Sequence, residues 1–542
     1  MQPEDLQFVW PVFLSFSLLL LARHFIQKFY QRDTLPKSSL GSHNWTRITD
    51  VSKVCQCTVC EMLLMNNLNE YYCDCCGVCA DLKCIPTANT SIQCKQISIV
   101  HPKHTKMKHL WTKGCMLLGS SLCDVCEEEC DVPNQIDYQC SWCLRMVHPS
   151  CKPKIAEVCD FGPYRKFIIP PDCITLETKR AGVRFRKSHV ITVRAPSWEP
   201  WTPLIVLGNR KSGNGDGSHI LSTFRRLLNP LQVVDLADKS PEEALQWVSL
   251  MPSSGQTLIL AAGGDGTAAW ILNTIHNMKL DPAPSVGIIP LGTGNDLSRV
   301  LGWGKLYDRD TCSPFQILDN LTRSKVAHLD RWSVQIKSIR QLRLTRALKC
   351  RWMYNYLSIG VDAQVALDFH NTRESSLYIF SSRAFNKFLY LTFGTQQAME
   401  RGCRDLDQRI ELYLDGERVD LPPIESVVVL NIPSWASGVD LWKLGRDSED
   451  GMGDSLEQDQ KIDDSKIEVM ALYSSFHIAR LQVGLSEPLK LGQVSQVKIK
   501  LLHKTPMQID GEPWLQPPAM ITLSHVDKAN VLMLSPSDTE ET

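Results

Sequence analysis

The chain has 542 residues, of which 43% are hydrophobic and 22% charged, with a formal net charge of −1. This length predicts about three domains. The balanced charge excludes a strongly basic nucleic-acid-binding protein, so we expect no nucleic-acid partner. Seventeen of the 21 cysteines lie between Cys55 and Cys159. Their clustering favours a local metal-binding framework over disulfides spread through a secreted protein.

The N-terminus contains an uncharged apolar run from Leu6 to Ala22, which is at the short end of what a helix needs to cross a bilayer. A signal peptide has basic residues before its apolar run, whereas here acidic residues precede the run and basic residues follow it. We predict a transmembrane helix in residues 1–32, with the rest of the chain on the cytoplasmic face of the endoplasmic reticulum or plasma membrane. A buried helix and a re-entrant hairpin kinked at Pro11 are the alternatives.

Cysteine and histidine residues between 109 and 159 have the spacing of zinc ligands. Two CxxC pairs, two histidines and two further cysteines supply eight ligands, enough for two closed tetrahedral zinc sites. A module of about 50 residues buries little core, so bound metal is its natural source of stability. The candidate ligands are His109, Cys123, Cys126, Cys140, Cys143, His148, Cys151 and Cys159.

This spacing resembles the C1 domain, the diacylglycerol-type zinc finger. The resemblance implies that the ligands interleave. One site would use His109, Cys140, Cys143 and Cys159, and the other Cys123, Cys126, His148 and Cys151.

Residues 43–94 repeat the pattern as an atypical finger. Asp81 stands where the pattern has a histidine, and because a carboxylate oxygen can ligate zinc, Asp81 is the candidate ligand there. Cysteines outside the pattern, such as Cys79, are predicted to be free thiols. The other candidate ligands are His43, Cys57, Cys60, Cys73, Cys76, Cys84 and Cys94.

Residues 160–202 contain five prolines, several basic residues and little apolar periodicity. This composition predicts a linker. Its basic residues are candidates for contact with anionic membrane lipids. A solvated loop is an equally good interpretation.

From residue 203, short apolar runs alternate with amphipathic stretches, which is typical of a parallel sheet with crossover helices. Glycine-rich loops follow three of the expected strands. Ligands bind at the carboxyl ends of strands in such sheets, and glycine lets backbone amides approach a phosphate. The sequence therefore predicts an α/β nucleotide lobe at 203–329. The strands are expected at 203–207, 231–236, 257–262 and 285–290, and the loops at 208–218, 263–267 and 291–299.

Asp265 lies at the tip of the second glycine loop, "GGDGT". A carboxylate repels phosphate unless a metal ion lies between them, so Asp265 is a candidate for catalysis or Mg²⁺ binding. Capping of the next helix is the alternative. The residues predicted to contact the nucleotide are Asn209, Ser212, Gly213, Gly263, Gly264, Gly266, Thr267, Gly292, Thr293, Gly294 and Asn295.

Strand patterns dominate residues 330–530, and a C-terminal tail follows at 531–542. Asp415–Gly416 separates two alternating runs and predicts a tight hairpin turn. We expect a β-rich accessory lobe, with the active site in a cleft between it and the α/β lobe. The expected strands include 331–336, 426–432, 466–473, 495–502 and 519–526.

The segments "GGDGT", "PLGTGNDL" and "QIDGEPW" resemble the catalytic and accessory regions of the diacylglycerol kinase family. With paired fingers and an N-terminal apolar run, the domain order resembles the epsilon type. The resemblance implies Mg²⁺- and ATP-dependent phosphorylation of diacylglycerol to phosphatidic acid. This reaction ends diacylglycerol signalling and feeds glycerophospholipid metabolism. It also implies a preference for arachidonoyl-containing diacylglycerol.

The resemblance further implies that Glu512 is the general base and Asp510 a metal-binding or positioning residue, with a plain β-turn as the alternative. Asp296 and Asp464 are candidate magnesium ligands beside Asp265. Sphingosine, ceramide and NAD kinases share a GGDGT-type loop but not its combination with paired fingers and DGEPW. A catalytically silent lipid-binding scaffold is the remaining alternative, and the intact loops and acids argue against it.

Overall fold

The structure is a computed structural model. Its described residues form two compact units, and each is treated by itself below. Unit 1 comprises Met1–Trp201, Arg225–Gln232 and Ala237–Pro252, and unit 2 comprises Thr202–Phe224, Val233–Leu236 and Ser253–Thr542. The described residues are 43–48, 55–64, 69–99, 106–113, 122–130, 137–180, 186–252, 256–309, 311–339, 349–375, 403–445, 459–482 and 484–535.

The N-terminal run Leu6–Ala22 lies outside the described residues. Among the helices that the structure describes, none has both the length and the apolar character needed to cross a bilayer. The transmembrane helix therefore stays a prediction from sequence.

Unit 1 contains two small β modules that correspond to the two predicted fingers. The cysteine pairs lie at the ends of short strands, so each module brings its thiols together with little apolar core. In the first module, β1 (Trp45–Arg47), β4 (Glu70–Cys73) and β5 (Cys79–Asp81) form one sheet, β2 (Cys55–Gln56) pairs with β3 (Leu63–Leu64), and α2 (Ile85–Ser91) follows. In the second, β6 (Trp111–Lys113), β7 (Tyr138–Cys140) and β8 (Met146–Val147) form the sheet.

Residues 160–201, where we expected a linker, are folded. Strands β9 (Ile174–Arg180) and β10 (Arg186–Val193) form an antiparallel pair. Phe167, Ile168 and Ile169, which precede these strands in the chain, are fully buried. The prolines lie in short turns and irregular stretches beside these elements, so they shape a compact structure instead of an extended connection.

Lys95 is the most unusual core residue of unit 1, because its side chain is fully buried. Its Nζ donates to the carbonyl oxygens of Arg226 at 2.6 Å and Leu228 at 2.9 Å. It also lies 4.4 Å from the ring centroid of Trp142, in the second module. A buried ammonium is tolerated only when such partners replace its hydration shell. Lys95 thus joins both modules to the segment 225–232.

Unit 2 is built on a ten-stranded sheet. Its parallel part follows the order β12 (Val233–Asp235), β11 (Leu204–Gly208), β13 (Leu258–Gly263) and β14 (Ser285–Pro290), which confirms the four predicted strands. The helices around it are α3 (Asp216–Leu227), α5 (Asp265–Met278), α6 (Asp296–Val300) and α7 (Pro314–Arg323). Unit 1 includes α4 (Pro241–Leu245) and the last turn of α3.

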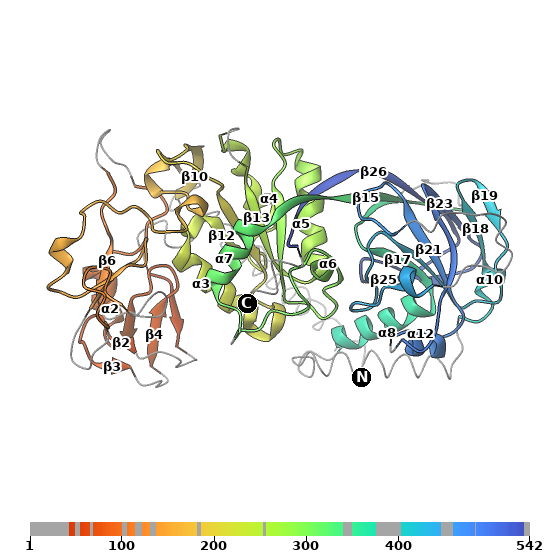
Figure 1. Ribbon diagram of the computed structural model, residues 1–542, viewed down its shortest axis with the longest axis horizontal. Helices are drawn as coiled ribbons and strands as arrows, with labels where there is room; N and C mark the ends of the chain where they lie inside the picture. Colours follow the sequence, from red (N-terminus) through yellow and green to blue (C-terminus); the bar gives the residue numbers. More distant parts are fainter. Residues whose placement is uncertain are drawn as a thin grey trace, which may run out of the picture. The chain divides into compact units, whose positions relative to one another are not determined.

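Two long strands continue this sheet into the β-rich lobe (Figure 1). Strand β15 (Lys325–Ser338) pairs antiparallel with β26 (Ala519–Met533) along its whole length, and β26 also meets β14. The lobes therefore share one sheet, which the separate strand patterns did not predict. Beyond β26 the sheet continues through β23 (Gln496–Leu501), β18 (Ile410–Leu414) and β19 (Glu417–Val419), while β16 (Lys349–Met353) pairs with β15.

A second, six-stranded sheet covers the first in the β-rich lobe, and buried aliphatic side chains fill the space between them. The predicted hairpin turn is confirmed, since Asp415 and Gly416 have φ values of 47° and 96°. The order of the second sheet is β22 (Leu489–Val494), β21 (Ile467–Leu472), β20 (Ser426–Leu430), β17 (Tyr356–Gly360), β24 (Thr505–Ile509) and β25 (Glu512–Gln516). The helices beside it include α8 (Val361–Ser375), α10 (Leu406–Arg409), α11 (Leu441–Leu444) and α12 (Ser475–Leu481).

Replacement of Lys95 by methionine tests the role of the buried ammonium. The change leaves buried carbonyl oxygens without a donor, so we expect a loss of about 2–4 kcal/mol of stability. The midpoint of thermal unfolding should fall by several degrees. Lys83→Met is the matched control, since Lys83 is exposed and also adjoins a cysteine of a predicted zinc site. Equal midpoints for the two variants would contradict this role.

Candidate active site

The second and third glycine loops leave neighbouring parallel strands and touch each other through their backbones. Gly263 at the end of β13 pairs with Pro290 at the end of β14. A Cβ added to Gly292 would lie 2.7 Å from the Cα of Gly264 and 2.6 Å from Asn295 Oδ1. No side chain fits there, so glycine is required by the packing of the two loops before any ligand is considered.

Asp265 joins the same two loops. It is the first residue of α5, but its carboxylate accepts the N–H groups of Asp296 and Leu297, both at 3.0 Å, in the first turn of α6. The alternative interpretation, that Asp265 caps the helix that follows it, is wrong: the N-cap of α5 is Gly264, and the Asp265 carboxylate binds the first turn of α6. Burial raises the pKa of the Asp265 carboxyl to about 6, and the nearby charge of Asp296 adds to the rise.

Asn295, predicted to contact nucleotide, has a left-handed backbone with φ of 54° and is buried. Its side chain accepts the N–H of Gly292 at 2.9 Å and donates to the carbonyl oxygens of Gly292 and Lys305. These bonds hold the third loop in shape. The residue supports the loop from inside, and its contact with nucleotide stays a prediction.

Asp296 connects α6 to a loop of the β-rich lobe. Its carboxylate accepts Ser434 Oγ at 2.5 Å and the N–H groups of Ser437 and Gly438 at 3.1 and 3.0 Å. Burial raises the pKa of Asp296. With these donors in place, Asp296 positions the two lobes, and its predicted role as a magnesium ligand gains no support from its contacts.

The first glycine loop follows β11. Asn209 Oδ1 accepts the N–H of Lys211 at 2.9 Å, and Gly213 has a φ of 66°, which glycine adopts without strain. The loop is anchored from outside by Arg210, whose Nη1 lies 2.7 Å from Asp235 Oδ2 on β12. Ser212 begins a short 3₁₀ turn that leads into α3.

Gly266 differs from the other glycines of the second loop. It lies in the first turn of α5, it is exposed, and a Cβ added there would meet nothing within 4 Å. Glycine in a helix costs up to about 1 kcal/mol relative to alanine. Since packing within the chain does not require this glycine, a ligand that approaches the backbone is the physical reason for it.

Asp510 is the first residue of the two-residue turn between β24 and β25, and Glu512 is the first residue after that turn. Asp510 has a φ of 48°, and its carboxylate accepts the N–H groups of Tyr354, Asn355 and Tyr356 at 2.8–3.1 Å. Burial raises the pKa of Asp510 to about 7, although these donors oppose the rise, and the charge of Asp265 adds to it. Asp510 therefore forms part of the predicted β-turn and also binds three backbone N–H groups through its carboxylate.

Glu512 is free to meet a substrate. Its side chain is 77% exposed, and its carboxylate lies 3.8 Å from Arg351 Nη1, which itself lies over the ring of Trp514. An exposed carboxylate beside a buried one is suited to accept a proton from an incoming hydroxyl group.

Asn355 contacts both Asp265 and Asp510, which are half-buried. Its N–H donates to Asp510, and its side chain contacts Asp265 and lowers the pKa of that carboxyl. The Asn355 Oδ1 atom is buried and has no hydrogen-bond partner in the part of the chain that the structure describes. Two carboxylates and one unpaired amide oxygen form an acceptor-rich group. These oxygen ligands are those that Mg²⁺ prefers.

A polar network missed by the sequence analysis supports this group. The fully buried Tyr354 receives a hydrogen bond from Arg331 at 2.8 Å and donates to Asn273 on α5 at 3.0 Å. Arg331 also reaches Asp527 at 2.6 Å. Tyr354 thereby couples the backbone that holds Asp510 to the helix that begins at Asp265. The "MYNY" segment offered a signal, as two tyrosines flank an asparagine at the start of a strand.

Asp464, the remaining candidate magnesium ligand, accepts the N–H of Lys466 at 3.0 Å within its own turn. Ser465 has a φ of 60°, a left-handed backbone conformation that glycine adopts more easily than serine. Its N–H donates to Asp330 at 2.6 Å, and the fully buried Asp330 also contacts His525. Asp330 was missed because it lies inside a strand. No contact joins Asp464 to the Asp265 group among those described.

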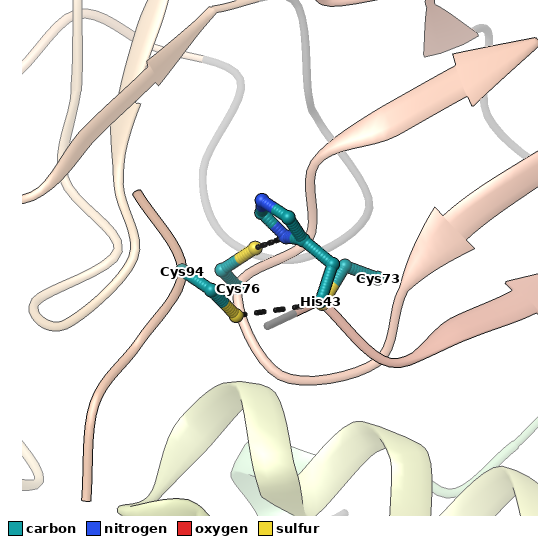
Figure 2. Close-up of side chains that lie close together, drawn as sticks. All are labelled: His43, Cys73, Cys76 and Cys94. Carbon is teal, nitrogen blue, oxygen red and sulfur yellow. Dashed lines mark hydrogen bonds between the residues drawn. The ribbon is translucent and has the colours of Figure 1, made fainter. Parts of the chain in front are cut away.

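The cysteine clusters of unit 1 agree with the predicted interleaved pairing (Figure 2). The ligand atoms in each cluster lie within 4.8 Å of one another, as a metal ion would need. Figure 2 shows the first of them, where Cys76 Sγ lies 3.3 Å from His43 Nδ1. The four-residue clusters are His43, Cys73, Cys76 and Cys94; His109, Cys140, Cys143 and Cys159; and Cys123, Cys126, His148 and Cys151.

A further cluster has three cysteines, Cys57, Cys60 and Cys84. Asp81, the predicted fourth ligand, accepts the N–H of Lys83 at 2.8 Å with its Oδ1. The free-thiol prediction is wrong for Cys79, which is in a disulfide bond. The donor sets fit zinc, with tetrahedral sulfur and nitrogen ligands in three clusters.

Glycine loops at the ends of parallel strands, facing acids from a β-rich lobe, define the class of a two-lobe lipid kinase. The comparisons identify the group within it. Models of the diacylglycerol kinase catalytic domain and accessory domain match residues 203–330 and 352–513. The chain belongs to the diacylglycerol kinase family.

Similar proteins of known name are also diacylglycerol kinases. The Caenorhabditis elegans protein "Probable diacylglycerol kinase 3" is 32% identical over 91% of this chain and 64% of its own length. Mouse diacylglycerol kinase theta is 38% identical over 59% of this chain and 34% of its own. The chain thus spans less than two thirds of either relative. A Bacillus anthracis crystal structure of a candidate diacylglycerol kinase covers 62% of this chain and 98% of its own at 16% identity, with a TM-score of 0.38.

Alanine at two glycines separates packing from ligand approach. Gly292→Ala forces a Cβ against Gly264 and should cost about 1–3 kcal/mol, seen as a lower unfolding midpoint. Gly266→Ala should leave the midpoint equal or higher, because alanine favours the helix. If ATP phosphates approach Gly266, this stable variant should show a KM for ATP raised by about tenfold or more. An unchanged KM would contradict the approach of ATP to the backbone at Gly266.

The raised pKa of Asp510 makes stability depend on pH. The folded protein holds this proton more tightly than the unfolded chain, so the contribution of Asp510 is present at low pH. It is lost as the pH rises from about 4 to about 7, by up to a few kcal/mol. Without divalent cations, Asp510→Asn should flatten the fall in unfolding midpoint between about pH 4 and pH 7. An identical pH dependence in both proteins would show that Asp510 is not responsible.

Proposed function

We propose that the chain is an ATP-dependent diacylglycerol kinase. The observation that carries the proposal is the meeting of two backbone-packed glycine loops with an acceptor-rich group, Asp265, Asn355 and Asp510, in a chain of this family. Phosphoryl transfer needs little covalent chemistry from the protein and depends on positioning and charge stabilisation. Glycine loops and clustered acids are the parts that such catalysis requires.

Glu512 would accept the proton of the free hydroxyl of diacylglycerol. The hydroxyl oxygen would attack the γ-phosphorus of ATP, the bond to the β,γ-bridging oxygen would break, and phosphatidic acid and ADP would result. Asp265 and Asn355 would hold Mg²⁺, which neutralises phosphate charge when it is bound. Asp510 would hold the backbone at 354–356 in place for the transfer.

The finer assignments are also proposals. Paired fingers and the N-terminal apolar run support an epsilon-like organisation, with the catalytic region on the cytoplasmic face of a membrane. Preference for arachidonoyl chains follows from that resemblance alone. The cysteine clusters support structural zinc in unit 1. Membrane lipids with anionic headgroups are the proposed surface partner.

A lipid panel tests the activity. The purified full chain with Mg-ATP should phosphorylate diacylglycerol in micelles, in preference to sphingosine and ceramide. Asp265→Asn and Glu512→Gln should each reduce kcat by about a hundredfold or more. Glu417→Gln, an exposed acid on β19, should retain activity.

Two outcomes would count against the assignment. Full activity of Asp265→Asn would show that the catalytic group lies elsewhere. Phosphorylation of sphingosine in place of diacylglycerol would overturn the substrate.

A further inference from the structure

The β-rich lobe carries an exposed apolar surface that the active site does not use. Phe476 on α12 is 68% exposed, Leu485 is 65% exposed and Tyr473 is 45% exposed. All three line one hollow of about 820 Å³. Large apolar side chains that stay in water lose the stabilisation that burial would give, and a group of them at one place is typical of an interaction surface.

Helix α12 presents two different faces. Its buried face consists of Ser475, His477, Ile478 and Leu481, which pack on the lobe. Phe476 and Arg480 are four residues apart, so they lie together on the outward face. An aromatic ring and a cation side by side on a surface helix are typical of a segment that lies in a membrane interface.

The charge around the hollow favours an anionic partner. Lys443 and Arg480 line it and are exposed, and Glu487 is the acidic residue among its described lining. Arg480 Nη2 donates to the carbonyl oxygen of Leu485 at 2.8 Å, which places the guanidinium beside that apolar side chain. Burial lowers the pKa of His477, so this ring does not add charge near neutral pH. Cations beside apolar tips match lipid headgroups above acyl chains.

The surface is connected to the catalytic turn. Helix α12 contacts α8, and α8 contacts β24 and β25, whose turn holds Asp510 (Figure 1). A bilayer held at α12 would therefore lie against the lobe that supplies the general base. We propose that Tyr473, Phe476, Leu485, Arg480 and Lys443 form a membrane-docking surface, here named the α12 surface, which binds the bilayer that contains the substrate. The inference rests on the proposed function, because that function requires a membrane-borne substrate.

The test uses the full chain and compares two double variants. Phe476→Ser with Leu485→Ser removes the apolar tips of the α12 surface. Val326→Ser with Leu502→Ser is the control, since both residues are exposed apolar side chains elsewhere in unit 2. Each variant is assayed on phosphatidylcholine vesicles with diacylglycerol, with and without phosphatidylserine, and on a monodisperse short-chain diacylglycerol.

We expect the α12 double variant to show an apparent KM for vesicle lipid raised by about tenfold or more. Its activity on the short-chain substrate should equal that of the unchanged protein. Hydrogen exchange of residues 473–487 reads the surface directly, so vesicle binding by another part of the chain does not obscure it. These amides should gain protection on addition of phosphatidylserine vesicles.

Three results would overturn the proposal. The first is no protection of 473–487 while the protein sediments with vesicles. The second is equal vesicle kinetics in both double variants. The third is protection that grows with protein concentration without lipid, which would assign the surface to a second copy of the chain. If the unchanged protein phosphorylates no diacylglycerol, the proposed function fails, while the exchange measurement still decides whether this surface meets a bilayer.

Discussion

The active site depends on the close approach of two glycine loops and on the one carboxylate that joins them. Gly264 and Gly292 meet backbone to backbone, and Asp265 accepts two N–H groups from the helix after the third loop. These bonds fix Asp265 at a position where its charge is poorly solvated. The same contacts that hold the two loops together thus leave the Asp265 carboxylate poorly solvated.

The site also contains more hydrogen-bond acceptors than donors. Asp265 and Asp510 repel each other, and burial raises the pKa of both carboxyls above the normal range. Asn355 donates to both carboxyls, but its own amide oxygen has no hydrogen-bond partner among the described residues. A bound divalent cation would reverse the balance, because it favours the ionised carboxylates and satisfies the amide oxygen. The raised pKa values and the unpaired oxygen are the features of this group that are consistent with the metal site proposed above.

The sequence predicted features that are local. Strands of the α/β lobe, their glycine loops and the Asp415–Gly416 turn follow from short patterns of apolar and turn residues. The sequence did not predict features formed by distant pairing. The continuous β15–β26 ladder, the Tyr354 network and the role of Asp296 each join residues more than twenty positions apart, and no periodicity records such contacts. Residues 160–201 were predicted to be a linker because they contain several prolines and little apolar periodicity, yet part of this irregular segment is buried.

The two cysteine-rich modules also show that the sequence predicted local contacts but not distant ones. Cysteine spacing predicted which thiols meet, since ligand geometry is local to each module. It could not show that the modules share a core with residues 225–232, which lie within the segment matched by the catalytic-domain model. Lys95 donates to carbonyl oxygens of that segment, and Arg225 forms a 2.6 Å ion pair with Asp74. These polar bonds bury charged groups of the first module against residues 225–232, so we expect the stability of unit 1 to depend on this segment as well as on the cysteine clusters.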